Sequence, residues 1–216
     1  LGERPGGMEV ESMKLLAAQN LTIGSDLIEE KSEKIKMVEL SLESASILRS
    51  KCAYDKAAVL LRVASKLLSQ ETMWTPDLYK TSIDVFSTLA EIELAVYEYQ
   101  RSSVAVGVIL EQATSVEDKQ RAHLVDVRGS IAQSRYDESI RKVCTYIGEL
   151  GSRVSLPSKA TIVKEMVRVK FALRGKSDED IKSLPILSDK RKKTVMALLN
   201  EVACIGFWRS CNTMYL

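Results

Sequence analysis

Apolar side chains recur at intervals of three and four residues along most of this 216-residue chain, and this spacing constrains the fold more than any other feature of the sequence. It places the apolar residues on one face of a helix, because an α-helix turns once in about 3.6 residues. The chain is also poor in proline and aromatic residues and rich in Ala, Leu, Glu, Lys and Ser, a balance that favours helices over sheets. The sequence therefore predicts an all-α fold.

The helices are expected to form three antiparallel hairpins, because the turns between successive apolar stripes are short. The turn of the first hairpin is expected at 49–53. The second hairpin is expected to be entered through Thr75-Pro76, since proline suits the first turn of a helix. The stripes that pair in this way are 35–45 with 57–68, 83–97 with 104–109, and 124–131 with 140–150, the last ending at Gly151.

Two of the second helices begin alike, with Ala53-Tyr54-Asp55-Lys56-Ala57 and Arg135-Tyr136-Asp137-Glu138-Ser139. The aromatic ring fills the gap at the turn, and the small residue three positions later lets the two helices approach closely. In the middle hairpin we expect Gln100 and Ser103 at these places. The pattern resembles the tetratricopeptide repeat (TPR), whose unit is one such hairpin of about 34 residues. We therefore expect the hairpins to stack as a TPR-like right-handed superhelical array, an α-solenoid with irregular and long helices.

The character of the sequence changes after Gly151. Arg153 to Ser158 is expected to be an extended connector, and 160–173 a further helix. The expected organisation is a disordered lead at 1–7, TPR-like hairpin repeats at 8–151, and a connector with further helices that continue the array at 152–216.

Gly175-Lys176-Ser177 looks like the end of a phosphate-binding loop. That motif needs a glycine five positions before its last glycine, and Lys170 stands there. The motif must also follow a buried strand, whereas the apolar residues upstream have helical spacing. We therefore interpret Gly175 as a helix stop rather than as part of a nucleotide site.

The acidic run after this glycine is interpreted as helix capping. Ser177 is expected to be the N-cap of a short helical turn, with Asp178 and Glu179 favourable toward its dipole. These carboxylates and Asp180 could instead hold a cation, but adjacent residues diverge around a helix and no calcium-loop spacing follows. Ser188 or Asp189 is expected to cap the last helix.

The four cysteines Cys52, Cys144, Cys204 and Cys211 have none of the two-residue spacings of zinc ribbons or redox motifs. We expect them to be buried small hydrophobes in a reduced compartment, and we expect no metal site. His123 is the only histidine. Because no nucleophile arrangement is recognisable near it, we expect it on a helix surface or groove wall rather than as a general base.

Charge and hydropathy argue against several classes of protein. The net charge of +2 gives no strong field toward nucleic acid or an anionic membrane, and the run from Lys190 to Lys193 is interpreted as a solvated face. No stretch resembles a signal peptide, and no apolar run approaches the roughly 18 residues of a membrane span. We therefore expect a cytoplasmic location. The glycine-rich start and the aromatic residues near the end lead us to expect a segment of a longer protein.

Several stretches in a fixed order resemble the helical-repeat segment of large multidomain signalling ATPases. In that family a protein kinase domain and an Orc1-like AAA or STAND-type ATPase domain precede the repeats, and GAF, histidine kinase or nucleotide cyclase modules follow them. The similar stretches are Gly24 to Ile28, Ala53 to Ala57, Leu67-Leu68, Met73-Trp74, Leu156-Pro157-Ser158, Arg174 to Pro185, and Lys193 to Leu199.

The resemblance implies a regulatory role. Nucleotide chemistry, with ATP and magnesium, would lie in the upstream ATPase domain, so no catalytic residue, cofactor or metal site transfers to this segment. We expect a non-enzymatic scaffold for protein–protein or interdomain contacts, with self-association possible and no nucleic acid or membrane partner. The alternative is a free-standing TPR-like adaptor that binds a peptide or protein. Trp74 and Trp208 could anchor a partner, but packing between repeats is favoured. We assign no functional residue from the sequence.

Overall fold

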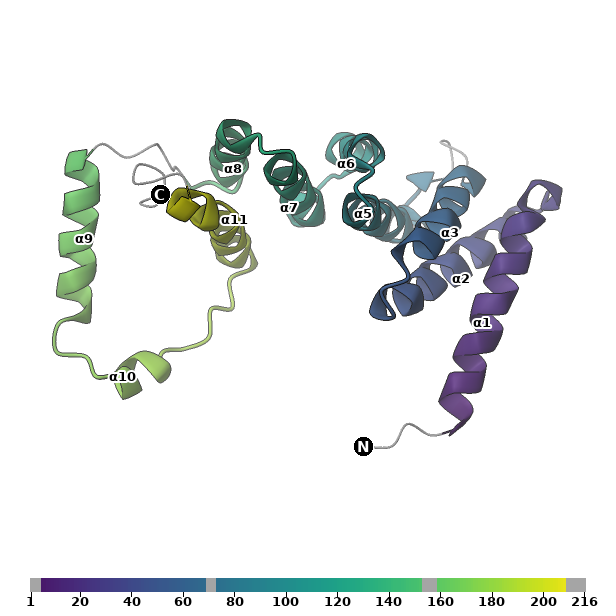
Figure 1. The fold of residues 1–216 in the computed structure, drawn as a ribbon, viewed down its shortest axis with the longest axis horizontal. Helices are drawn as coiled ribbons and strands as arrows, with labels where there is room; N and C mark the ends of the chain where they lie inside the picture. Colours follow the sequence, from purple (N-terminus) through teal and green to yellow (C-terminus); the bar gives the residue numbers. More distant parts are fainter. Residues whose placement is uncertain (1–4, 69–72, 153–158, 209–216) are drawn as a thin grey trace. The chain divides into compact units, whose positions relative to one another are not determined.

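The structure is a computed structural model, and it describes residues 5–68, 73–152 and 159–208. Side chains are described at 9–68, 73–152 and 163–203. The described residues form helices and their connections with no strand, which confirms the all-α fold class (Figure 1). The helices are α1 (Pro5–Ile23), η1 (Ser25–Leu27), α2 (Lys31–Ser50), α3 (Tyr54–Leu67), α5 (Tyr79–Ala95), α6 (Tyr99–Gln112), α7 (Val116–Ala132), α8 (Tyr136–Glu149), α9 (Lys159–Leu173), α10 (Asp178–Lys182) and α11 (Lys190–Trp208).

The chain forms two compact units, Leu1–Gly129 and Ser130–Leu216. The division lies within α7, whereas the sequence places a change of character at Gly151. The first unit holds α1 to most of α7 and has a continuous hydrophobic core. The second holds the end of α7 and α8 to α11.

Helix α1 begins at Pro5, inside the stretch 1–7 that we expected to lack structure. Residues 1–4 lie outside the described part of the chain. The helix packs against α2, and two ion pairs join them: Lys14 to Glu43 at 2.7 Å and Lys51 to Glu11 at 3.0 Å. Because all four side chains are at least two-fifths exposed, these pairs add little stability.

Three connections between helices have the same backbone geometry. Cys52, Tyr97 and Ser134 each adopt a left-handed conformation, with φ of 56°, 64° and 59°. The N–H of the following residue donates to the carbonyl five positions earlier, at 2.8 Å for Ala53, 2.9 Å for Glu98 and 2.8 Å for Arg135. These are the hydrogen bonds of a Schellman cap. Glycine normally takes the left-handed position, so the recurrence of other residues there is unusual.

A tyrosine follows each of these turns as the first residue of the second helix: Tyr54, Tyr99 and Tyr136. A buried small residue stands three positions later in each case, and these residues are Ala57, Ser102 and Ser139. The prediction of Gln100 and Ser103 for the middle hairpin was therefore wrong by one residue. The error arose because Tyr97 was counted as part of the first helix, whereas it forms the turn.

The hairpins of the first unit pack through their small residues. Ser102 of α6 is buried, and its hydroxyl donates to the carbonyl of Ala90 in α5 at 2.9 Å. Helix α3 of the first hairpin packs in turn on α5 of the second. Figure 1 shows α2 and α3 beside each other in the first unit, as expected for a hairpin with its turn at 51–53.

Helix α5 begins three residues later than the sequence suggests. Thr75 and Pro76 lie in a turn, in which the N–H of Tyr79 donates to the Thr75 carbonyl at 2.8 Å. The turn buries Leu78, and this burial explains why the helix starts after it rather than at the proline. The Tyr79 hydroxyl then donates to Asp118 of α7 at 2.8 Å, so the entry to α5 is tied to the first helix of the following hairpin.

In the second unit α8 packs against α11. The buried apolar residues of these two helices are Ile140, Val143, Tyr146, Ile147, Leu150, Leu198 and Val202. Gly151 has φ of 80° at the end of α8, as expected for a helix stop. The connector expected from Arg153 to Ser158 lies outside the described residues.

Helices α9 and α10 confirm the local predictions from sequence. The helix expected at 160–173 is observed as Lys159–Leu173, and Gly175 ends it with φ of 78°. Ser177 caps α10 in a capping box with Asp180. Asp189 caps α11, because its carboxylate accepts from the backbone N–H groups of Arg191 and Lys192 at 2.9 and 3.2 Å.

Candidate binding surfaces

Around Gly175, two of the backbone donors that a phosphate cradle would use are already engaged. The N–H of Lys176 donates to the carbonyl of Leu173 at 3.1 Å, and the N–H of Ser177 donates to the carboxylate of Asp180 at 2.8 Å. The segment joins two helices, so it also lacks the preceding strand that a phosphate-binding loop needs. The two bonds from Ser177 hold the pKa of Asp180 below its ordinary value.

His123 is buried in α7, so its expected place on a helix surface or groove wall was wrong. His123 lies eleven positions before Ser134, the left-handed residue of the turn that follows α7. Ser41 and Phe86 stand at the same distance before the left-handed residues of the first two hairpins, and all three side chains are buried. Burial and the nearby Lys119 lower the pKa of His123 to about 4, with Asp126 opposing them. The imidazole is therefore neutral at pH 7.

The other chemically suggestive residues also have structural surroundings. Among the described residues, no group of three His, Cys, Asp or Glu side chains is placed to hold a metal ion. Cys52 is exposed in its turn, so the expectation that it is buried was wrong. Cys144 is half-buried, and burial raises the pKa of its thiol. The side chains of Cys204 and Cys211 lie outside the described part.

The structure also bears on the basic run, on Trp208 and on membrane-spanning helices. The four basic residues from Lys190 to Lys193 are exposed, as a solvated face requires. The side chain of Trp208 is not among those described. Within the described parts of the chain, no helix is long and apolar enough to span a membrane.

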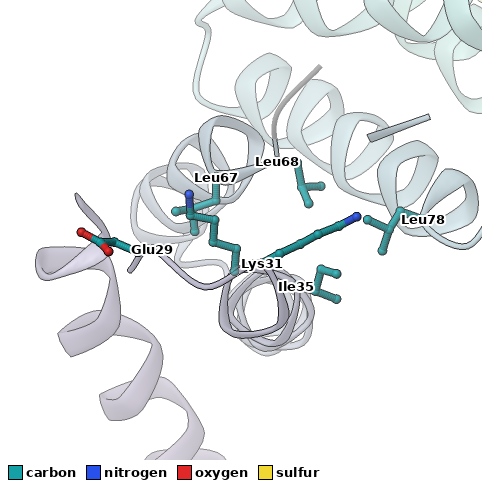
Figure 2. A pocket seen from close by; sticks show the side chains of 7 residues that line it. Glu29, Lys31, Ile35, Leu67, Leu68 and Leu78 are labelled. Carbon is teal, nitrogen blue, oxygen red and sulfur yellow. The ribbon is translucent and has the colours of Figure 1, made fainter. Parts of the chain in front are cut away.

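A small pocket, here called the lysine pocket, lies among the first residues of α2, the end of α3 and the turn before α5. Its volume is about 170 Å³, and its apolar lining is made by Ile35, Leu67, Leu68 and Leu78. Figure 2 shows Leu68 and Leu78 opposite Ile35, with the Glu29 carboxylate far from Leu78.

Charged groups of both signs surround the opening of the lysine pocket. Lys31, Lys34 and Glu29 line it, and among the described residues no ion pair is found for either lysine. The pocket can receive an aliphatic group of about the size of one side chain.

A larger pocket of about 520 Å³, here called the aromatic pocket, lies between the second helices α3 and α6. Trp74 and Phe86 line it and are stacked, with ring centroids 5.9 Å apart and planes inclined by 21°. Tyr79 meets the Trp74 ring edge-on at 6.2 Å. Trp74 also packs on the core of the first unit. Its place between hairpins agrees with the packing role predicted for it, but it also forms the wall of a pocket.

The rest of the aromatic pocket combines apolar and polar side chains. Leu68, Met73 and Val108 contribute apolar surface, and Ser65, Glu111 and Gln112 contribute polar groups. The Ser65 hydroxyl donates to the Arg62 carbonyl at 2.9 Å, which leaves its oxygen able to accept. Glu111 is exposed, and the described residues offer its carboxylate no hydrogen bond or ion pair.

An ion network joins the first helices of the hairpins. The carboxylate of Glu91 in α5 binds Arg49 of α2 at 2.6 Å and Arg121 of α7 at 2.8 Å. Arg121 also donates to Thr88 at 3.0 Å and lies 3.4 Å from a carboxylate oxygen of Asp84. The network crosses three helices, so it fixes their relative rotation more than it adds to stability.

A separate, largely buried ion pair links the first hairpin to the second. Arg62 of α3 donates to both carboxylate oxygens of Glu93 in α5, at 2.6 and 2.7 Å. The Glu93 side chain is only 1% exposed, and Arg62 covers it. The hydrogen bond to Glu93 raises the pKa of Arg62, so the arginine is charged throughout the physiological range. Because the carboxylate is buried, this arginine holds α3 and α5 in one register.

The sequence did not reveal either pocket or the two ion networks. Heptad-like spacing identifies which residues face inward but not which of them meet across two hairpins. The pairing of Arg62 with Glu93 joins residues 31 positions apart. The only sequence signal for the aromatic pocket was Trp74 beside Met73, which we assigned to packing.

Comparison of the chain with protein-family models, with curated proteins and with solved structures gives no match. The resemblance to signalling ATPases and the TPR-like stacking therefore stay predictions.

Proposed function

We propose that this chain is a non-catalytic helical-repeat scaffold of a multidomain ATP-binding signalling protein, where it holds a partner protein or a neighbouring domain. The observation that carries the proposal is the threefold recurrence of one turn, with a left-handed residue at Cys52, Tyr97 and Ser134. In each case a tyrosine begins the next helix and a buried small residue follows. A unit repeated in this way is the basis of solenoid proteins that bind extended partners.

The interactions between hairpins support a TPR-like stack as part of this proposal. The Arg62–Glu93 pair joins α3 of the first hairpin to α5 of the second. The ion pairs of Glu91 join α2, α5 and α7, which are the first helices of the three hairpins. Such nearest-neighbour contacts stabilise repeat arrays, in which each unit packs on the next. The two pockets lie on the first unit, where the stack would present a fixed surface to a partner.

The buried titratable groups support a scaffold better than an enzyme. His123 is neutral and enclosed, and Glu93 is neutralised by Arg62. A general base needs a substrate within hydrogen-bond reach, and a nucleophile needs a base beside it. We therefore place ATP, magnesium and any kinase chemistry in other domains of the parent protein.

The test is photo-cross-linking in the complete protein inside its own cells. A cross-linking amino acid is placed at Gln112, beside the aromatic pocket, and in a matched control at Glu39, an exposed position of α2. We expect one protein or one neighbouring domain to be linked at Gln112 and not at Glu39. Equal background at both positions would contradict a scaffold that uses this surface.

Sequencing the complete transcript separates the two forms of the proposal. Kinase and ATPase motifs upstream, with a sensor or cyclase module downstream, would support the signalling protein. A short reading frame that closes near Leu216 would support the alternative of a free-standing TPR-like adaptor.

A further inference from the structure

We propose that the aromatic pocket binds an arginine side chain of the protein segment that the scaffold holds. This inference rests on the proposed function and adds the chemistry of the partner. It follows from three properties of the described lining of the pocket: its aromatic wall, its one charged side chain and its hydrogen-bond acceptors.

The aromatic wall suits a planar cation. Trp74 and Phe86 form a nearly parallel stack that lines the pocket. A guanidinium group is attracted to the face of such rings by cation–π and stacking interactions, and tryptophan is the strongest of the aromatic partners. The volume of about 520 Å³ leaves space for the whole arginine side chain together with part of the segment that carries it.

The charge of the pocket has the opposite sign to arginine. Glu111 is the only charged residue among the described residues that line it, so its wall has a net negative charge. Arg62, whose carbonyl accepts from Ser65 of the pocket, is engaged with Glu93. The Glu111 carboxylate is not engaged by any described residue, and a carboxylate can accept two parallel hydrogen bonds from one guanidinium.

The remaining polar groups are acceptors as well. The side-chain oxygen of Gln112 can accept, and so can the Ser65 hydroxyl oxygen, which already donates to the Arg62 carbonyl. A guanidinium has five donors in a fixed plane and no acceptor, so it matches acceptors arranged around an aromatic wall. A lysine ammonium would satisfy the charge but not the stacking geometry.

The lysine pocket supports no comparable inference. Lys31 and Lys34 outnumber Glu29 in its lining, so its net charge is positive, and no described residue that lines it is aromatic. Its volume of about 170 Å³ also limits it to a small group.

The experiment uses the full 216-residue chain with Trp208→Phe, which leaves Trp74 as the only tryptophan. Its fluorescence is titrated with acetyl-Ala-Arg-Ala-amide, with the lysine peptide, and with the citrulline peptide, which keeps the shape of arginine but has no charge. We expect saturable binding in the millimolar range for the arginine peptide, weaker binding for lysine, and none for citrulline.

Two variants separate the pocket from general charge effects. Glu111→Gln is expected to weaken binding of the arginine peptide about tenfold, because it removes a charged hydrogen-bond acceptor. Glu39→Gln removes the same charge from an exposed site outside the pocket, and it is expected to leave binding unchanged. The urea midpoint of both variants should match that of the parent chain, because both side chains are exposed.

The assignment is overturned if citrulline binds as well as arginine, or if Glu111→Gln binds like the parent chain. Failure of this inference can be told apart from failure of the proposed function. A partner that still cross-links at Gln112, while the arginine peptide does not bind, would overturn the arginine assignment and leave the scaffold. Arginine binding in a protein that cross-links no partner would instead contradict the scaffold.

Discussion

Helices α5 and α9 have similar apolar spacing in the sequence but opposite surroundings in the structure. Ten of the seventeen residues of α5 are buried, including the polar side chains of Ser82 and Glu93. Every side chain that the structure describes in α9, from Val163 to Leu173, is exposed. The comparison shows that spacing predicts a helix and its apolar side, whereas burial depends on the neighbours that the fold supplies.

The difference matters for stability and for binding. Helix α5 lies between α3 and α6, so its side chains contribute to the core of the first unit. Helix α9 carries large exposed apolar residues: Val163, Met166, Val167, Val169, Phe171 and Leu173. Burial of such side chains yields about 1.5–3 kcal/mol each, and α9 gains none of this in the described structure.

The largest expected effect compares two arginines. Arg62→Ala should lower the free energy of unfolding by about 3 kcal/mol, because it leaves the Glu93 carboxylate buried without a counter-charge. Arg168 of α9 pairs with Glu165 at 3.5 Å on an exposed surface, so Arg168→Ala should cost less than about 0.5 kcal/mol. Urea unfolding of both variants checks this. Equal losses would show that Glu93 is not enclosed as described.

The next comparison is between the stability costs of the same substitution, Val→Ala, in α5 and in α9. Val85 of α5 is fully buried, and Val85→Ala should cost about 2 kcal/mol through lost burial and a residual cavity. Val167 of α9 is 47% exposed, and Val167→Ala should change stability by less than about 0.5 kcal/mol. Thermal and urea unfolding both report the difference. A larger loss at Val167 would mean that α9 is covered in solution.

The buried histidine should make the first unit sensitive to acid. Its pKa is about 4 in the folded chain and 6.5 in the unfolded chain, so between these values the unfolded chain binds the extra proton. Stability should therefore fall as pH falls below about 6.5, by about 2 kcal/mol at pH 5.

Urea unfolding at pH 7 and pH 5 measures this loss, and His123→Gln serves as the control. The variant removes the titrating group, so it should lose most of the difference between the two pH values. A parent chain and variant with the same pH dependence would place His123 in contact with solvent.

The smallest expected effect tests whether the turns are equivalent. Cys52→Gly and Ser134→Gly place glycine where φ is 56° and 59°, one in each unit. Each should stabilise its turn by up to about 0.5 kcal/mol, because the relief of left-handed strain exceeds the entropy cost of glycine. Differential scanning calorimetry of the two variants should show shifts of the same sign. Opposite signs would break the equivalence on which the repeat is based.

Local rules in the sequence predicted much of the helical structure. The stop at Gly175 and the cap at Ser177 depend on backbone conformation and on one nearby side chain, so they could be recognised without tertiary information. The start of α5 could not be recognised in this way, because the burial of Leu78 moves it to a position after the proline. The turn at Tyr97 was misplaced by one residue because an aromatic residue rarely adopts a left-handed conformation.

The two pockets were harder to predict than the helices. Trp74 was noticed in the sequence, but its stacking on Phe86 and the pocket that it forms with Ser65 of the preceding hairpin depend on the tertiary packing. His123 was misplaced because the inward stripe of its helix was expected to begin at Leu124, and only the register of the turn at Ser134 shows that His123 faces inward. Contacts between residues far apart in the sequence need the fold before they can be identified.

Native-state hydrogen exchange, measured amide by amide on the 216-residue chain, tests the central claim most directly. That claim is that the hairpins of the first unit form one packed array, on which the binding surfaces are built. The account predicts that amides in α3, α5 and α6 share one slow exchange rate, at least about a thousandfold slower than those in α9. Exchange in α5 as fast as in α9, or unrelated rates in α3 and α5, would contradict it.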